Sequence, residues 1–348
     1  MNQQINQDIV FSTINDKIIY NRGKSMSSIK LESELANCYE CVHCRITNSG
    51  LSAISILMNA LYIKHVNDNI NIIYANELYP LTPAVLSAPT KYGNKNVNVD
   101  EFDVTNASEL INLFTQKYFN GINILFAESA SNPHSYMFDF EIIPLLRKLS
   151  KILYVIIDNT WLTELILNPF DYDVDFVILS LTKYYSAGNA IGGAILADYN
   201  IEHVDIWMEL TGQHTSPVNC EIIYDNIASM AQRIERCSDL TTRIIDWIQI
   251  NTTVKTIHPY NKNNSLWDKY AESFYPCVIV LVVDETVIQK FKNQTSIDIK
   301  VSFGSKMSRI NPLSILETQK DGFYHIRLAI GYDDTYQRIT NILGSILC

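Results

Sequence analysis

Short apolar runs alternate with amphipathic segments over the first half of the chain. Four runs have the length of buried strands: 70–75, 122–127, 153–157 and 174–179. Residues 51–66 place apolar side chains at helical spacing, and 140–149 is a further amphipathic stretch. Strands that alternate with helices predict a mostly parallel sheet with helices on both faces.

The pattern changes after about Asn219. Residues 221–250 predict one long bridging helix, and 334–347 predict a closing helix. Three runs between them predict the strands of a smaller, antiparallel sheet: 277–283, 299–303 and 324–330. A polar stretch precedes a short helix predicted at 30–38. We therefore expect an N-terminal arm (1–30), a large domain (31–219), and a bridging helix with a small C-terminal α/β domain (220–348).

Composition narrows the classes of protein. Of the 348 residues, 47% are hydrophobic and 18% charged, which predicts a folded globular chain. The net charge of −10 argues against a nucleic-acid surface, which is normally basic. No apolar run is long enough to span a bilayer, and residues 1–16 lack the apolar core of a signal peptide. The seven scattered cysteines predict free thiols, and so a cytoplasmic protein.

Cys38, Cys41 and Cys44 have a spacing that zinc or an iron–sulfur cluster can use, with His43 beside them. The alternative is three buried thiols across a helix end and the next strand. A metal site usually needs a second ligand pair, which does not appear later in the chain. We expect no metal.

Two predicted strands each end beside a chemically useful residue. Asp158 follows the run 152–157, and Lys183 follows the run 174–179 with Ser180 and Thr182 just before it. In parallel sheets, ligands bind outside the carboxyl ends of the strands. A lysine amine, a carboxylate and hydroxyl donors are the groups that pyridoxal phosphate (PLP) requires. Taken alone, Asp158 would be read as a helix cap and Lys183 as a surface lysine.

The order of three motifs resembles the PLP enzymes of cysteine and methionine metabolism, a family that includes cystathionine synthases and lyases, methionine γ-lyase and O-acetylhomoserine sulfhydrylase. The motifs are Glu128-Ser129-Ala130-Ser131-Asn132-Pro133, Asp158-Asn159-Thr160 and Ser180-Leu181-Thr182-Lys183-Tyr184. The family has proline where this chain has Ala130. The resemblance covers about residues 18–348 and implies the fold-type I, aspartate-aminotransferase-like α/β architecture.

The resemblance assigns cofactor roles residue by residue. Lys183 is similar to the Schiff-base lysine that also moves the α-proton, and Asp158 to the partner of the ring nitrogen. Tyr79 resembles the ring-stacking tyrosine, although Pro80-Leu81 replaces the usual glycines. Other positions resemble the groups that contact the phosphate or ring: Ser49, Gly50, Leu51, Asn132, Ser180 and Thr182. The alternatives from the residues alone are a helix cap, a packed tyrosine and an Asn-Pro turn.

The arm and the C-terminal region supply the remaining expected contacts. Tyr20 and Arg22 resemble an arm that reaches the phosphate in a neighbouring subunit, which implies a homo-oligomer, most simply a dimer of dimers. The alternative is a solvated arm. Arg327 resembles the arginine that binds the substrate α-carboxylate, and Val301-Ser302-Phe303-Gly304 is similar to the family's Ser-Leu-Gly loop.

The uncharged Val301 favours a small substrate, because cystathionine's distal charges would lack partners in an apolar pocket. The expected activity is elimination or replacement on a sulfur-containing or O-acylated amino acid, as in methionine γ-lyase or an O-acylhomoserine sulfhydrylase. The alternatives are a cystathionine synthase or lyase, a transaminase or decarboxylase, and a degenerate subunit without turnover.

Overall fold

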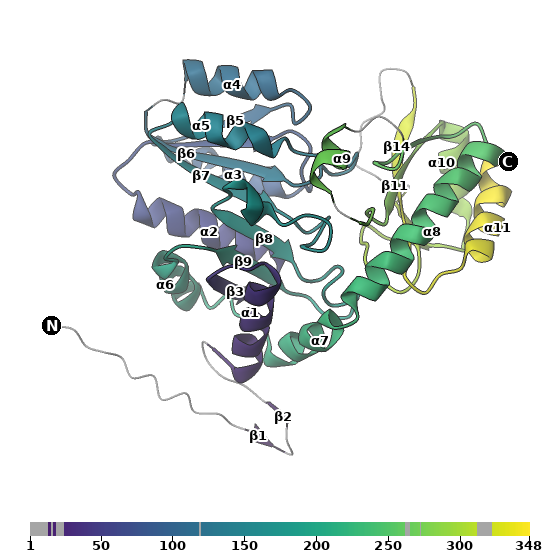
Figure 1. Ribbon diagram of the computed structural model, residues 1–348, viewed down its shortest axis with the longest axis horizontal. Coiled ribbons are helices and arrows are strands. Elements are labelled where there is room, and N and C mark those ends of the chain that lie inside the picture. Colours follow the sequence, from purple (N-terminus) through teal and green to yellow (C-terminus); the bar gives the residue numbers. More distant parts are fainter. Residues whose placement is uncertain are drawn as a thin grey trace.

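A computed structural model describes residues 13–14, 17–18, 24–117, 120–261, 265–271, 273–311 and 322–348. A large domain built on a seven-stranded sheet is joined to a smaller domain by a long helix (Figure 1). A two-stranded pairing, β1 (Thr13–Ile14) with β2 (Lys17–Ile18), precedes the large domain.

The large sheet has the strand order β3-β9-β8-β7-β6-β4-β5. Its neighbours pair in parallel except β9, which is antiparallel to both β8 and β3. Most of its side chains are buried, as expected for a parallel sheet covered on both faces. The strands are β3 (His43–Thr47), β4 (Ile70–Ala75), β5 (Val97–Phe102), β6 (Ile122–Glu128), β7 (Ile152–Asp158), β8 (Phe176–Ser180) and β9 (Gly193–Ala197).

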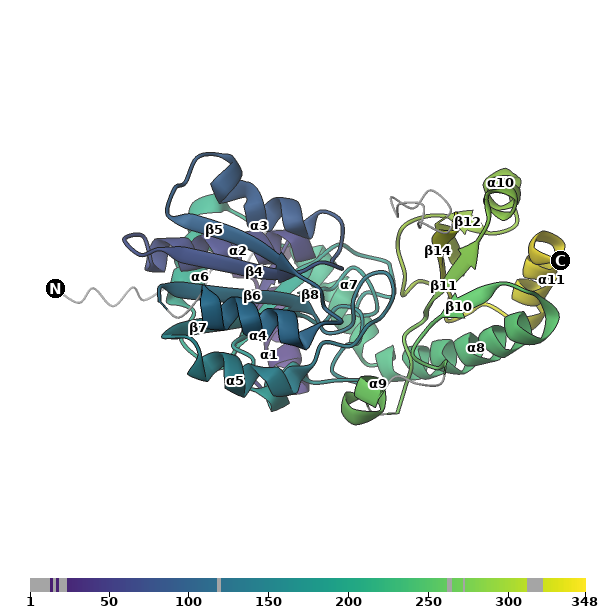
Figure 2. The same cartoon turned by 90° about the horizontal axis from the view of Figure 1, so that it is seen from above.

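Helices cover both faces of this sheet. In Figure 2, α4 and α5 lie on one face, and α2, α3 and α6 lie on the other. Ser25 caps α1 through a capping box with Ser28, and Ser49 caps α2 by accepting the Ser52 N–H. The helices are α1 (Met26–Cys38), α2 (Gly50–Lys64), α3 (Thr82–Lys91), α4 (Ala107–Gln116), α5 (Ile143–Lys148), α6 (Glu202–Thr211) and α7 (Pro217–Ile227), with 3₁₀ turns at Phe140–Ile142 and Pro169–Tyr172.

The small domain holds a five-stranded sheet of order β10-β11-β14-β13-β12. Figure 2 shows α10 and α11 on the side of this sheet that faces away from the large domain, with α8 running along it. The elements are α8 (Met230–Asn251), β10 (Lys255–Ile257), α9 (Ser265–Tyr270), β11 (Val278–Val283), α10 (Glu285–Asn293), β12 (Asp298–Ile299), β13 (Arg309–Asn311), β14 (Tyr324–Ala329) and α11 (Tyr336–Leu347).

The mostly parallel large sheet and the mostly antiparallel small sheet confirm the predicted fold class. The four apolar runs of the large domain are strands to within two residues at each end. Within the described residues, no helix is both long and apolar enough to cross a membrane.

Two predicted elements were wrong in part. The long helix predicted at 221–250 is two helices, α7 and α8, which meet at Ala228–Ser229. The Arg233 side chain fills this junction, because it donates to the Asn226 carbonyl at 2.7 Å and to Ser229 Oγ at 3.2 Å. The strand predicted at 299–303 is only β12, and the chain beyond it leaves the sheet for the site described below.

Candidate active site

The carboxyl ends of the central parallel strands bring the candidate residues together. Glu128 and Asp158 end β6 and β7 and lie directly opposite each other in the sheet register. Ser180 ends the next strand, β8. This is the edge at which ligands bind in such sheets.

Ser49 and Gly50 lie against Ser180 and the start of β9. A methyl group added at Gly193 would come within 2.2 Å of the Ser49 carbonyl oxygen, and one added at Gly50 within 2.9 Å of Ser180 Cβ. Two glycines are therefore required for this close backbone approach. The first N–H groups of α2, those of Gly50 and Leu51, have no bonding partner inside their own helix. The surroundings form a cup suited to an anion.

The two hydroxyl residues before Lys183 have different partners. Ser180 lies beside Gly50 in the cup, and its main-chain N–H donates to Thr160 Oγ1 at 2.7 Å. The Thr182 hydroxyl lies 3.3 Å from the Gly192 carbonyl oxygen, to which it donates. Thr182 thus contributes to the shape of the loop, and Ser180 borders the anion cup directly.

Lys183 lies between the two domains. Its Nζ donates to Ser302 Oγ at 3.2 Å and lies 5.4 Å from the centre of the Phe303 ring. Burial, followed by the charges of Arg327 and Arg309, lowers the pKa of the Lys183 amine to about 8, against the opposing effect of Asp158. The amine can therefore take up and release a proton near neutral pH.

Two carboxyl groups, those of Glu128 and Asp158, lie at neighbouring strand ends, and Asp158 is within electrostatic reach of Lys183. Burial raises the pKa of Asp158, although bonds from Thr160 and the charge of Lys183 act against that rise. Burial and the nearby charge of Asp158 hold the pKa of Glu128 well above its usual range. Glu128 also accepts the Tyr79 N–H. The pair therefore favours a cation or a protonated group above it.

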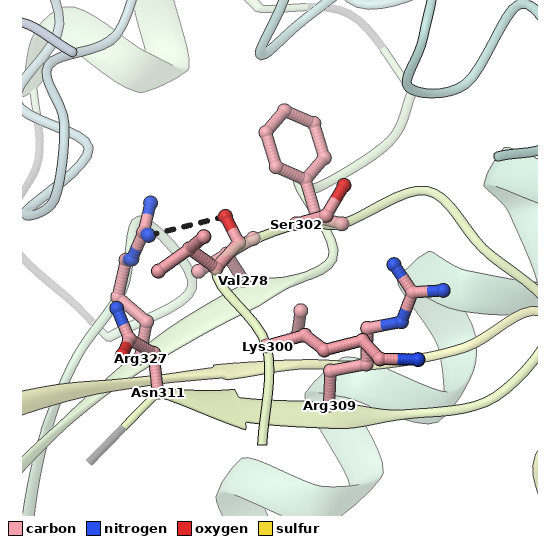
Figure 3. Close-up of a pocket in the computed structure, with 9 residues that line it drawn as sticks. Val278, Lys300, Ser302, Arg309, Asn311 and Arg327 are labelled. Carbon is pink, nitrogen blue, oxygen red and sulfur yellow. Dashed lines mark hydrogen bonds between the residues drawn. The ribbon is translucent and has the colours of Figure 1, made fainter. Parts of the chain in front are cut away.

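The small domain contributes the opposite wall. Arg327 Nη1 donates to Asn132 Oδ1 at 3.0 Å, and Nη2 donates to the Val301 carbonyl at 3.4 Å. Figure 3 shows Arg327 and Arg309 on opposite sides of a pocket with Val278 between them. Val301 lines the same pocket and is 63% exposed, and its carbonyl is the group that bonds to Arg327.

Tyr79 stands at the end of a loop that leads from β4 into α3. The residue is 39% exposed, so it is available to a ligand. Leu81 occupies the cap position of α3, and Pro83 follows within its first turn, where proline is tolerated. Pro80-Leu81 therefore takes part in starting a helix.

The three cysteines near the N-terminus lie at the end of α1, just after it and in β3, as the alternative interpretation expected. Cys38, Cys41 and Cys44 are free thiols. Burial raises the pKa of Cys38 to about 12 and that of Cys41 to about 11, so both thiols are protonated at neutral pH. In the described part of the chain, no three His, Cys, Asp or Glu side chains form a cluster that could hold a metal ion.

Tyr20 and Arg22, the predicted arm residues, lie outside the described residues. Sequence reasoning missed the roles of Glu128 and Thr160, which approach the site through the Tyr79 and Ser180 main-chain N–H groups. Their positions at or just after strand ends were a usable signal, since neighbouring parallel strands end at the same edge.

The residues present fit PLP. The cup offers free helix N–H groups and the Ser180 hydroxyl for a phosphate, and its glycines leave no room for side chains. Lys183 has a weakly basic amine for covalent attachment, and Asp158 is a buried carboxyl within electrostatic reach of it. Asn132 and Tyr79 lie on the loops that border the same edge.

Known proteins resemble this chain in sequence and in fold. The cystathionine beta-lyase of Schizosaccharomyces pombe is 25% identical over 304 residues, which cover 85% of this chain and 75% of that protein. The L-methionine gamma-lyase of Treponema denticola is 23% identical over 260 residues, 71% of this chain but only 60% of that protein.

A candidate O-acetylhomoserine (thiol)-lyase of Campylobacter jejuni, solved with pyridoxyl-lysine-5'-monophosphate, superposes with a TM-score of 0.80 at 23% identity. The match covers 95% of this chain and 88% of that one. The family model for Cys/Met metabolism PLP-dependent enzymes matches residues 2–340. The chain therefore belongs to the PLP-dependent enzymes of cysteine and methionine metabolism.

Proposed function

We propose that this enzyme catalyses elimination or replacement at the side chain of a small sulfur-containing or O-acylated amino acid. The observation that carries the proposal is the environment of Lys183. Its amine has a lowered pKa, bonds to Ser302 and is within electrostatic reach of Asp158 on one domain and Arg327 on the other. A side chain that gains and loses a proton, a carboxylate for the cofactor ring nitrogen and a cation for the substrate carboxylate are the groups that this reaction needs.

The residues of the large domain would hold the cofactor. The α2 N-terminus and Ser180 would bind the phosphate, Asp158 the ring nitrogen, Lys183 the reactive carbon, and Asn132 and Tyr79 the ring. When bound, PLP withdraws electrons from an amino acid and makes its α-proton acidic. Lys183, once free, would carry that proton between carbons of the substrate, and Ser302 would orient its amine.

Arg327 would bind the substrate α-carboxylate. A planar guanidinium can hold both carboxylate oxygens, and this one is fixed by Asn132. The substrate is then a free amino acid with an unblocked carboxyl group. The exposed, uncharged Val301 beside it favours a short side chain such as that of methionine, homocysteine or an O-acylhomoserine.

A cystathionine synthase or lyase is the alternative, and one observation favours it. Lys300 and Arg309 line the same pocket as Arg327, so a second carboxylate at the far end of a substrate would find cations there. The 25% identity to a cystathionine beta-lyase points the same way.

The deciding experiment compares kcat/KM for methionine, O-acetylhomoserine and cystathionine, with products identified. We expect the short substrates to be preferred, and a clear preference for cystathionine would establish the alternative. An absorbance spectrum of the purified protein, recorded before and after each amino acid is added, separates both of these enzymes from a subunit without turnover.

We also propose an oligomer whose sites are completed by Tyr20 and Arg22 of a neighbouring chain, in the cytoplasm. A fully loaded, active monomer would contradict this assembly.

A further inference from the structure

A chain of three hydrogen-bonded side chains joins the two domains beside Arg327. His134 Nδ1 lies 2.6 Å from Glu77 Oε1, and His134 Nε2 lies 2.6 Å from His325 Nδ1. Glu77 and His134 belong to loops of the large domain, and His325 belongs to β14 of the small domain. All three residues are partly buried, which strengthens such bonds relative to bulk water.

Glu77 anchors the loop that presents Asn132. Ser131 Oγ donates to its second carboxylate oxygen at 2.6 Å, and the Asn132 N–H donates to its main-chain carbonyl at 3.3 Å. The carboxylate thus has a donor on each oxygen, Ser131 on one and His134 on the other. This one acid fixes both the loop and the histidine that follows it.

His325 and Arg327 are two residues apart on β14, so their side chains share one face of the strand. That face meets the same loop twice, through the His134–His325 contact and through the Arg327–Asn132 bond of 3.0 Å. Two bridges this close together fix how far β14 stands from the loop. The position of the Arg327 guanidinium depends on that separation.

The carboxylate at one end of this series of hydrogen bonds determines which His134 nitrogen must donate. A carboxylate can only accept, so the Glu77 contact requires a hydrogen on His134 Nδ1. The contact between the two rings then holds one hydrogen, given by one imidazole and accepted by the other. His134 therefore needs both ring nitrogens, which no aliphatic or single amide side chain supplies.

We propose that His134 and His325 are positioning residues that hold Arg327 where it binds the substrate carboxylate. This inference rests on the proposed role of Arg327. Neither histidine touches the reacting atoms. Their effect is on the geometry of binding, because a displaced guanidinium no longer meets both oxygens of the carboxylate.

The first test uses the PLP-loaded enzyme and its best substrate. His325→Leu should raise KM about tenfold or more while kcat changes less than about threefold. His325→Asn keeps a donor close to the Nδ1 position and should restore most of the loss. The matched control is His203→Leu, a partly buried position on α6, which should leave both constants unchanged. An unchanged KM in His325→Leu, or no rescue by asparagine, would overturn the proposal.

The second test needs no substrate. Urea unfolding of His134→Leu, His325→Leu and the double variant should be non-additive, because either single change already breaks the shared bond. Additive losses would show that the two histidines are not coupled and would overturn the proposal. If the wild type processes no amino acid, the proposed function fails, and the unfolding result still shows whether the interdomain chain exists.

Discussion

The two halves of the site are built in different ways. The large-domain half relies on backbone: strand ends, the first turn of α2, and two glycines whose neighbours lie within 2.2–2.9 Å of where a side chain would begin. The small-domain half relies on one long side chain, Arg327, guided by Asn132 and the Val301 carbonyl. A cup lined by backbone tolerates almost no added side-chain atoms, whereas a binding site made by one side chain can be altered by conservative substitutions around it. We therefore expect cofactor binding to fail abruptly under mutation and substrate binding to change gradually.

The largest effect should come from Lys183→Ala, which removes the reactive amine placed between both halves. Turnover should fall by at least about 10³-fold, since both covalent attachment and proton transfer are lost. Borohydride should trap a cofactor adduct at this lysine in the wild type only. Lys306→Ala, which changes an exposed lysine paired with Asp333, is the control and should behave like the wild type. Full activity in Lys183→Ala would refute the mechanism.

Gly193→Ala tests the backbone cup. Its new methyl group would meet main-chain atoms of Ser49 and Gly50, which cannot move without opening the cup. We expect a loss of about 3 kcal/mol in stability together with the loss of PLP binding. Gly344→Ala is the matched control, because its nearest neighbours are Trp247 atoms at 3.7 Å. That helical change should stabilise by up to about 1 kcal/mol. Equal behaviour of the two variants in thermal melts would contradict this account.

Arg327→Ala tests the side-chain grip. Binding of the amino acid should weaken by about 2–5 kcal/mol, because a partly desolvated charge pair loses one side. Amino-acid amides, which lack the carboxylate, should be affected much less. Arg309→Ala is the companion variant, and it should weaken only substrates that carry a second anion. If Arg327→Ala treats acids and amides as the wild type does, the arginine has another role.

The smallest effect concerns the cofactor-free protein and pH. The pKa of Lys183 is about 8 in the fold and near the ordinary 10.5 in the unfolded chain. Between these values the unfolded chain binds a proton that the fold does not, so stability falls as the pH drops from about 10.5 to 8 and the penalty is complete below 8. Lys183→Met should therefore stabilise this form at pH 7 by on the order of 2–3 kcal/mol, and far less at pH 10.5. Urea titrations at both pH values, with Lys306→Met as control, measure this. A gain independent of pH would indicate packing rather than charge.

The same contrast explains what the sequence could predict. Strands β4, β6, β7 and β8 are continuous apolar runs, and Asp158 and Lys183 follow from their ends. Strand β9 was missed, because Gly193-Ala194 lacks the apolar, β-branched composition that marks a buried strand, and β3 was expected only as the strand that follows the cysteine-bearing helix end. The break between α7 and α8 depends on a tertiary contact of Arg233 with Tyr184, which no local pattern encodes.

Within the site, residue types were easier to predict than geometry. The motif order pointed to Lys183 and Arg327, but not to the contact of Lys183 with Ser302 or to the use of the Val301 carbonyl. Those contacts cross between domains and depend on how the two sheets face each other. The hydrogen-bonded series Glu77–His134–His325 could not be predicted for the same reason, because His134 is 57 residues from Glu77 and 191 residues from His325 in the sequence.

Trp161 has a practical consequence for experiments. It is one of four tryptophans, follows Thr160 directly, and packs at 5.2 Å against Phe303, the residue after Ser302. Its indole N–H is buried and has no partner among the described residues. An indole packed between the two domains beside the site should change its emission when the cofactor binds. The enzyme therefore has an intrinsic fluorophore beside its site, and stopped-flow fluorescence can follow cofactor binding without an added dye.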